Sequence, residues 1–194
     1  MVERKENGTR PDNNNRDNNN RGRQGRDSRP RRIEEKDDLI RKLICINRVT
    51  KVVKGGRNMR FAAMMVVGDG AGNVGIGMGK ANEVPVAIEK AVAAAKKNMR
   101  KISLVNNTIP HEVVGKFGRG SVMMLPAEEG TGVIAGGPVR SVLEAVGIKD
   151  IRTKSRGTSN PVNCVKATLE GLSTLRTVEE VAAMRGKKPS DILG

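Results

Sequence analysis

The sequence contains no tryptophan or tyrosine, and Phe61 and Phe117 are its only phenylalanines. Proteins that bind single-stranded nucleic acid usually stack the bases on aromatic side chains. Two rings cannot form such a platform. Any nucleic acid bound by this chain is therefore expected to be a structured RNA, contacted through its phosphates and its shape.

Residues that bind metals or carry out catalysis are also scarce. Cys45 and Cys164 stand alone, and His111 is the only histidine, so no familiar zinc spacing exists. His111 has no evident nucleophile partner, and the acidic pair Glu128 and Glu129 lacks the pocket that acid–base chemistry needs. We expect a protein that is not an enzyme and that has no metal and no cofactor.

Long hydrophobic segments are absent too. The longest clear apolar run, residues 61–67, is far too short to cross a bilayer, and the N-terminus is too polar for a secretory signal. Two isolated cysteines fit reduced thiols. These features predict a cytoplasmic protein that does not contact membranes.

Acidic residues are outnumbered by basic ones, 21 to 36, which gives a formal net charge of +15. So basic a protein usually meets a polyanion, and nucleic acid is the commonest one. A merely soluble basic protein is the alternative.

The chain divides by composition. Residues 1–33 are rich in Asn, Arg and Gly and carry almost no large apolar side chains, which predicts a disordered basic tail. Either the tail contacts RNA or it only improves solubility. Residues 34–38 suggest a short helical segment that leads into the first domain.

Residues 34–103 are predicted to form a first domain of three strands and a helix. The strands cover residues 43–53, 58–67 and a short stretch from Val74. Asn82 is predicted to cap the helix, with Pro85 in its first turn. Its apolar face is formed by residues at helical spacing: Val84, Ile88, Val92, Ala95 and Met99.

Residues 104–194 are predicted to form a second, α/β domain. Strands are expected at residues 113–117, 121–125 and 148–153, and a helix from Pro138 to Val146. Asn160 caps the next helix. Thr177 and Glu180 form a capping box for a last helix, which Gly186 closes.

Basic residues gather around the first hairpin. If Gly55 and Gly56 form its two-residue turn, Lys54 pairs with Arg57 and Lys51 with Arg60. Like charges opposed in a sheet cost about 0.2–1 kcal/mol, and a phosphate between them would remove that cost. We therefore predict RNA binding by the hairpin; the alternative is a solvated hairpin. The predicted contacts are Arg48, Lys51, Lys54, Gly55, Gly56, Arg57 and Arg60.

A second basic segment covers residues 149–156, where cations partly alternate along a predicted sheet edge. Its charge density indicates phosphate contact, although a basic strand face is often only solvated. The predicted contacts here are Lys154 and Arg156, with Lys116 and Arg119 on either side of Phe117.

Glycine-rich segments imitate nucleotide-binding motifs. Residues 70–75 match G-x-G-x-x-G, but glycines continue to alternate at residues 77 and 79, as in a strand that another backbone approaches closely. The loop at residues 130–137 precedes a helix. Its amides could bind a phosphate or an acidic side chain, or simply form a turn and a cap.

Five segments together resemble the family of bacterial small-subunit ribosomal protein five. They are residues 47–57, 66–70, 75–85, 129–137 and 157–161. The resemblance covers about residues 34–194. It implies an α+β protein of two domains: one like double-stranded-RNA-binding domains, and one α/β domain with a left-handed β-α-β crossover.

The same resemblance implies a structural constituent of the small ribosomal subunit. Such a protein binds small-subunit rRNA, contacts ribosomal proteins four and eight, and lies near mRNA at the entry region, where it affects translational accuracy. The residues of the matching protein-interface stretch are Gly130, Gly132 and Arg140. The residues themselves leave two other hypotheses open: a free RNA chaperone or regulatory double-strand binder, and a phosphotransferase that uses the glycine loops.

Overall fold

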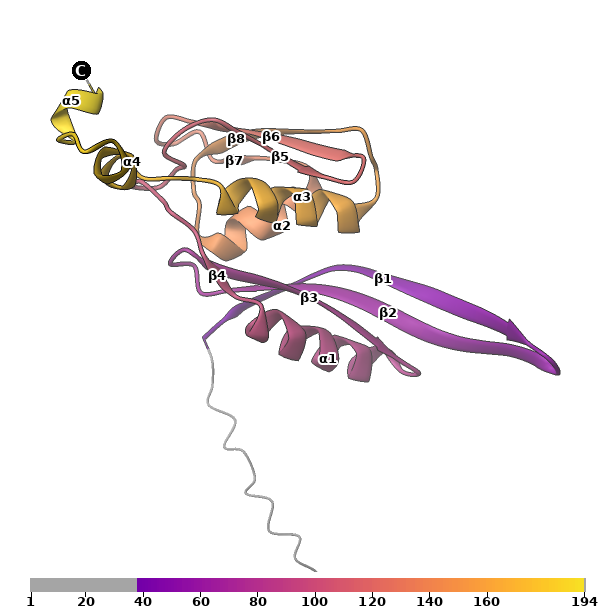
Figure 1. Cartoon of the computed structure of the whole chain (residues 1–194). Coiled ribbons are helices and arrows are strands. Elements are labelled where there is room, and N and C mark those ends of the chain that lie inside the picture. The colour runs from indigo at the N-terminus through magenta and orange to yellow at the C-terminus, as the bar shows by residue number, and fades with distance from the viewer. Residues whose placement is uncertain (1–37, 194) are drawn as a thin grey trace, which may run out of the picture. The chain divides into compact units, whose positions relative to one another are not determined.

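The first half of the described chain is a four-stranded antiparallel sheet with one helix (Figure 1). The computed structural model describes residues 38–193, so the predicted tail and most of the helical segment before the first domain lie outside it. The elements in chain order are β1 (Ile40–Val53), β2 (Gly56–Gly68), β3 (Asn73–Ala81), α1 (Val84–Lys97) and β4 (Arg100–Lys101).

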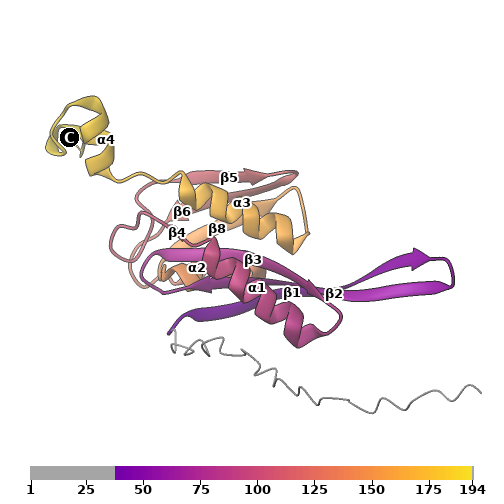
Figure 2. The ribbon, with the colours of Figure 1, turned by 60° about the horizontal axis from the view of Figure 1, so that its bottom comes forward.

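A stripe of glycines on β3 lets α1 lie directly on the sheet (Figure 2). A Cβ atom on Gly77 would overlap the backbone of Ala91, and one on Gly79 would overlap that of Ala87. Small residues on both surfaces bring the two backbones together. The alternating glycines thus accommodate a helix of the same chain, and their place on a strand confirms that residues 70–75 are no dinucleotide motif.

The start and the buried face of α1 differ from the prediction. Glu83, not Asn82, is the N-cap, and its side chain accepts no capping hydrogen bond. The fully buried residues are Ala87, Ala91 and Ala95, whereas Val84 and Ile88 are only partly buried. Larger side chains cannot fit opposite the glycine stripe, so they flank it.

The second half contains another four-stranded sheet, in the order β5-β6-β8-β7. Its elements are β5 (Val113–Phe117), β6 (Gly120–Pro126), β7 (Val133–Ile134), α2 (Gly137–Val146), β8 (Ile151–Arg156), α3 (Pro161–Ser173), α4 (Val178–Arg185) and α5 (Ser190–Leu193). β7 and β8 are parallel and α2 connects them, which makes a β-α-β unit. The handedness of this unit stays a prediction.

Strand β8 departs from the prediction in two ways. It begins at Ile151, because Ile148 lies in a buried loop before it. Its first two residues, Ile151 and Arg152, also pair with the two-residue strand β7 within the glycine loop, so only residues 153–156 lie along an edge of the described sheet. By contrast, the Asn160 cap and the Thr177 capping box are confirmed.

Both halves share one hydrophobic core. Val66 and Val74 of the first sheet belong to the same buried cluster as Val142 of α2 and Met124 of β6. Figure 1 shows α2 and α3 between the two sheets, with α1 on the opposite face of the first. The two sheets and the helices packed on them make a mixed α/β structure, which is consistent with the predicted α+β fold. Within residues 38–193 no helix is long and apolar enough to span a membrane.

Candidate nucleic-acid interface

The hairpin of β1 and β2 extends beyond the rest of the described chain (Figure 1). Residues 46–60, here called the arm, are all exposed. No aspartate or glutamate occurs between Leu39 and Gly68, so five cations of the arm face no acidic residue on their own hairpin. The arm is therefore a strongly positive projection, with its predicted contacts Arg48, Lys51, Lys54, Arg57 and Arg60 all exposed.

The pairing predicted for these cations is wrong. Val53 pairs with Gly56, Val52 with Arg57, and Val49 with Arg60. The turn therefore consists of Lys54 and Gly55.

The physical reason is the backbone of the turn. Gly55 has φ +88°, whereas Asn106 is the only non-glycine residue with positive φ in residues 38–193, so Lys54 keeps a negative φ. Gly55 is the one central residue of the turn that needs a positive φ, and Gly56, with φ +156°, begins the next strand. No two arm cations are directly opposed, so the predicted phosphate between opposed cations has no basis in this register.

The observed register spreads the cations over both faces of the arm. Arg57 shares a face with Arg48, Arg60 shares the other with Lys51, and Lys54 lies in the turn. The positive charge surrounds the projection, as suits a hairpin enclosed by phosphates on several sides.

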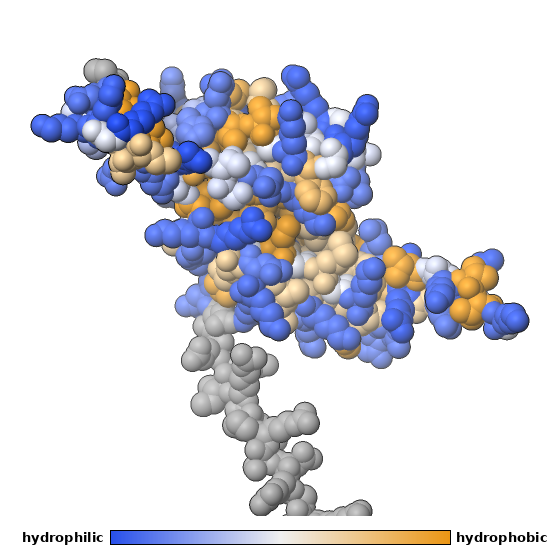
Figure 3. Space-filling model, in the orientation of Figure 1, coloured by the Kyte–Doolittle hydropathy of each residue, from blue (hydrophilic) through white to orange (hydrophobic). Residues whose placement is uncertain are grey.

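Apolar side chains are exposed between the cations. Val52 is 74% exposed and Met59 44%, and Val49 and Val53 are exposed as well. Figure 3 shows hydrophilic and hydrophobic patches succeeding one another along the arm. The arm therefore offers apolar side chains as well as cations for contact with a partner.

A second basic surface lies on the second sheet. Arg152, Lys154 and Arg156 alternate with less exposed residues along β8. Ser121 pairs with both Lys116 and Arg156, so these two cations lie on one face, in one row across the sheet. Arg119 is exposed in the β5–β6 turn.

The opposite face of this sheet is buried. A Cβ atom on Gly115 of β5 would overlap the Ala167 backbone of α3. The basic face is therefore the outer one. The arm and this outer face belong to different sheets, so the predicted RNA contacts form two separate surfaces.

The glycine loop, residues 130–137, forms hydrogen bonds within the chain. The Gly132 amide donates to the buried carboxylate of Asp150 over 2.9 Å, and the Ile151 amide donates to the Gly132 carbonyl. Gly130 is exposed with φ +86°. Of the two uses predicted for these amides, an acidic side chain is the one observed at Gly132.

Arg140 belongs to a small ion-pair network. Its Nε donates to Glu144 over 2.8 Å, and the same carboxylate pairs with Lys42 of β1. Hydrogen bonds from Lys42 and Arg140 hold the pKa of Glu144 below its ordinary value, although burial opposes this. Arg140 nevertheless stays 58% exposed and can still meet a partner.

Sequence reasoning missed one cluster of cations. Arg100 of β4 and Lys166 of α3 line the same groove, and the Lys166 ammonium lies 4.7 Å from the centre of the Phe117 ring. No local motif joins residues so far apart in the chain. Within residues 38–193, no cluster of His, Cys, Asp or Glu could hold a metal ion.

Comparison with known proteins provides evidence for the family of this chain. Residues 39–103 match the ribosomal protein S5 N-terminal domain, and residues 115–185 match the ribosomal protein S5 C-terminal domain. The chain is 57% identical over 162 residues to the small ribosomal subunit proteins uS5 of Cupriavidus pinatubonensis and Cupriavidus taiwanensis. Each match covers 83% of this chain and 94% of the relative. The chain therefore belongs to the ribosomal protein S5 family, a non-enzymatic family, as the sequence resemblance predicts.

Proposed function

We propose that this chain is a structural component of the small ribosomal subunit that binds small-subunit rRNA through the arm and the outer face of the second sheet. The observation that carries the proposal is the arm: cations on both faces, no acidic residue and exposed valines. In solvent, the charges of such a hairpin are not neutralised and its apolar side chains are not covered. Placed among phosphates, its charges are neutralised and its apolar side chains are covered.

The finer assignments follow from the family resemblance. We propose contacts with ribosomal proteins four and eight, a position near mRNA at the entry region, and an effect on translational accuracy. Gly130, Gly132 and Arg140 are the proposed residues of the contact with protein four. Arg140 is supported by its exposure, and Gly130 by the open space around its Cα atom. The proposed location is cytoplasmic and ribosome-bound.

Binding to particles assembled without this chain tests the role of the arm. The double variant Lys54→Glu and Arg57→Glu is compared with wild type over a range of salt concentrations. We expect weaker binding and a smaller slope of log affinity against log salt. The slope should fall by about one for each phosphate that the arm no longer touches.

The matched control reverses two exposed cations outside the arm, Lys187 and Lys188. We expect it to bind with an affinity and a salt slope close to those of wild type. An arm variant that keeps the wild-type slope would show that the arm contacts no phosphate.

Sedimentation separates the structural role from that of a free RNA chaperone. A structural component co-sediments with small subunits at moderate salt. A chaperone stays at the top of the gradient, and this result would overturn the proposal.

A further inference from the structure

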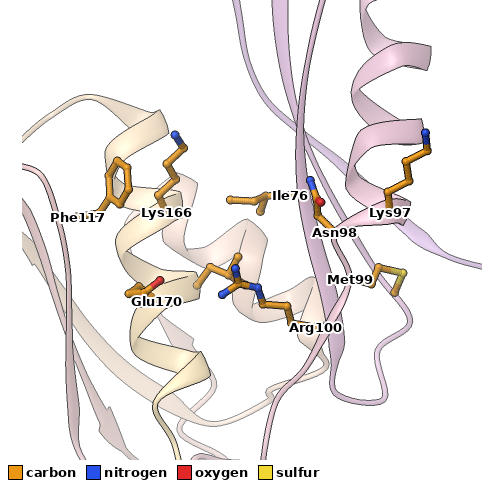
Figure 4. A pocket seen from close by; sticks show the side chains of 9 residues that line it. Ile76, Lys97, Asn98, Met99, Arg100, Phe117, Lys166 and Glu170 are labelled. Carbon is orange, nitrogen blue, oxygen red and sulfur yellow. The ribbon is translucent and has the colours of Figure 1, made fainter.

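A groove of about 520 Å³ lies where the end of the first half faces α3 (Figure 4). Its size is within the roughly 300–1,000 Å³ of pockets that hold small molecules. Phe117, Lys166 and Glu170 form one wall. Ile76, Asn98 and Arg100 lie on the side of β3 and β4. None of these residues belongs to the arm or to the outer face of the second sheet.

The charge of the groove favours an anion. Three cations line it, Lys97, Arg100 and Lys166, against the single carboxylate of Glu170. Within residues 38–193 no ion pair joins Glu170 to Arg100 or Lys166. The Lys166 ammonium instead lies over the Phe117 ring. The positive charge is therefore not neutralised from within the groove.

The groove also has an apolar part. Ile76, Met99 and Leu169 contribute to its lining, and each is partly or mostly buried. A bare phosphate or a partner's carboxylate would neutralise the cations but leave this apolar surface exposed to water. Glu170 would also repel such an anion. A ligand that combines an anion, a flat ring and a hydrogen-bond donor uses all three features.

We propose that this groove binds one unstacked nucleotide of small-subunit rRNA. Arg100 and Lys166 contact its phosphate, the base lies on the apolar part, and the Glu170 carboxylate accepts a hydrogen bond from an amino group of the base. Recognition of splayed-out bases is the usual mode of specific RNA binding. The proposal rests on the rRNA-binding function proposed above and adds a site to it.

Removing the Glu170 carboxylate distinguishes base recognition from simple attraction of phosphate. If the groove only attracts phosphate, Glu170→Ala removes a repulsive charge and tightens binding. If Glu170 holds a base, the same change weakens binding about tenfold, because a charge-assisted hydrogen bond is removed. Binding is measured on small-subunit particles assembled without this chain. Unchanged or tighter binding would overturn the proposal.

The control is Glu89→Ala, which removes an exposed carboxylate from α1 outside the groove. We expect it to bind as tightly as wild type or more tightly. Both substitutions are at exposed helical positions, where alanine is favourable, and thermal melting confirms that each variant is folded. If wild type and Glu89→Ala bind and Glu170→Ala binds equally well, the groove proposal fails while the proposed function stands.

Photocrosslinking identifies the occupant directly. The full-length chain carries a benzophenone amino acid in place of Met99, which lines the groove. After assembly and irradiation we expect a crosslink to a single rRNA nucleotide. A crosslink to a ribosomal protein, or none while the same probe at Lys154 crosslinks, would overturn the proposal.

Discussion

Gly68 of β2 lies so close to Ala145 of α2 that a Cβ atom on the glycine would overlap the Ala145 carbonyl oxygen. The turn after β2 continues this contact. The amide of Gly70 donates to the Ala145 carbonyl over 3.1 Å, and that of Gly72 to the Val146 carbonyl over 2.9 Å. Carbonyls in the last turn of a helix have no partner within it. The β2–β3 turn thus caps α2 and joins the first sheet to the second half of the chain.

The variant Gly68→Ala tests this junction. We expect it to lower the free energy of unfolding by about 1–3 kcal/mol, because the added methyl group forces two backbones apart. Chemical denaturation followed by circular dichroism measures the effect. In the control, Gly137→Ala, the new methyl group meets no atom within 4 Å, so stability should stay equal or rise slightly. Equal effects of the two changes would contradict the close packing at Gly68.

The Glu144 network predicts a dependence of stability on pH. Because the pKa of Glu144 is lower in the folded chain than its ordinary 4.5, its ion pairs stabilise the fold above that pH. This stability is lost as the pH falls through the lower, folded value. Glu144→Gln should cost about 1 kcal/mol at neutral pH, a typical value for partly exposed pairs.

Thermal unfolding from pH 7 to pH 3 measures this effect. The difference between Glu144→Gln and wild type should shrink as the medium becomes more acidic than pH 4.5. The control Glu112→Gln changes an exposed carboxylate for which the structure shows no ion pair among residues 38–193. A Glu144 variant whose deficit is constant over the whole range would rule out the network as its cause.

The capping box of α4 predicts a local effect. The Thr177 hydroxyl accepts from the Glu180 amide, and the Glu180 carboxylate accepts from the Thr177 amide. Thr177→Ala should destabilise this helix by about 1 kcal/mol. Ala182 is its only fully buried residue, so the loss should stay within α4.

Hydrogen exchange of the α4 amides measures that loss. Protection should fall in residues 178–185 and stay unchanged in α3. Thr177→Ser keeps the accepting oxygen and should retain most of the protection. Global destabilisation by Thr177→Ala would show that α4 is more strongly coupled to the core than its exposure indicates.

The exposed valines of the arm predict a separation of stability from binding. Val52 is 74% exposed, so Val52→Ala should change the free energy of unfolding by less than about 0.5 kcal/mol. Its binding to particles assembled without the chain should nevertheless weaken, because the proposed rRNA contact would cover this side chain. The control is Val86→Ala on α1, which removes a similar side chain that is 37% exposed. Equal binding by both variants would mean that the arm contributes only charge.

Local signals in the sequence were sufficient to predict several helices, strands and helix caps. The strand at residues 113–117 has the predicted bounds. The Asn160 cap and the Thr177 box are formed as predicted, because such bonds depend only on residues a few positions apart. The register of the arm was not predictable in this way. Two adjacent glycines allow either of two turns one residue apart, and this shift decides which cations face each other.

The sequence by itself determined the charge and composition of this protein: a net charge of +15, a hairpin segment without acidic residues, and too few aromatic rings to form a stacking platform for single-stranded bases. Only the tertiary structure decided which helix packs against the glycine stripe of β3. It also decided that Arg100 and Lys166 line one groove. The physical reason is the distance along the chain between the residues involved. Net charge follows from composition and helix caps from residues a few positions apart, whereas packing against a glycine and the lining of a groove depend on segments that meet only after folding.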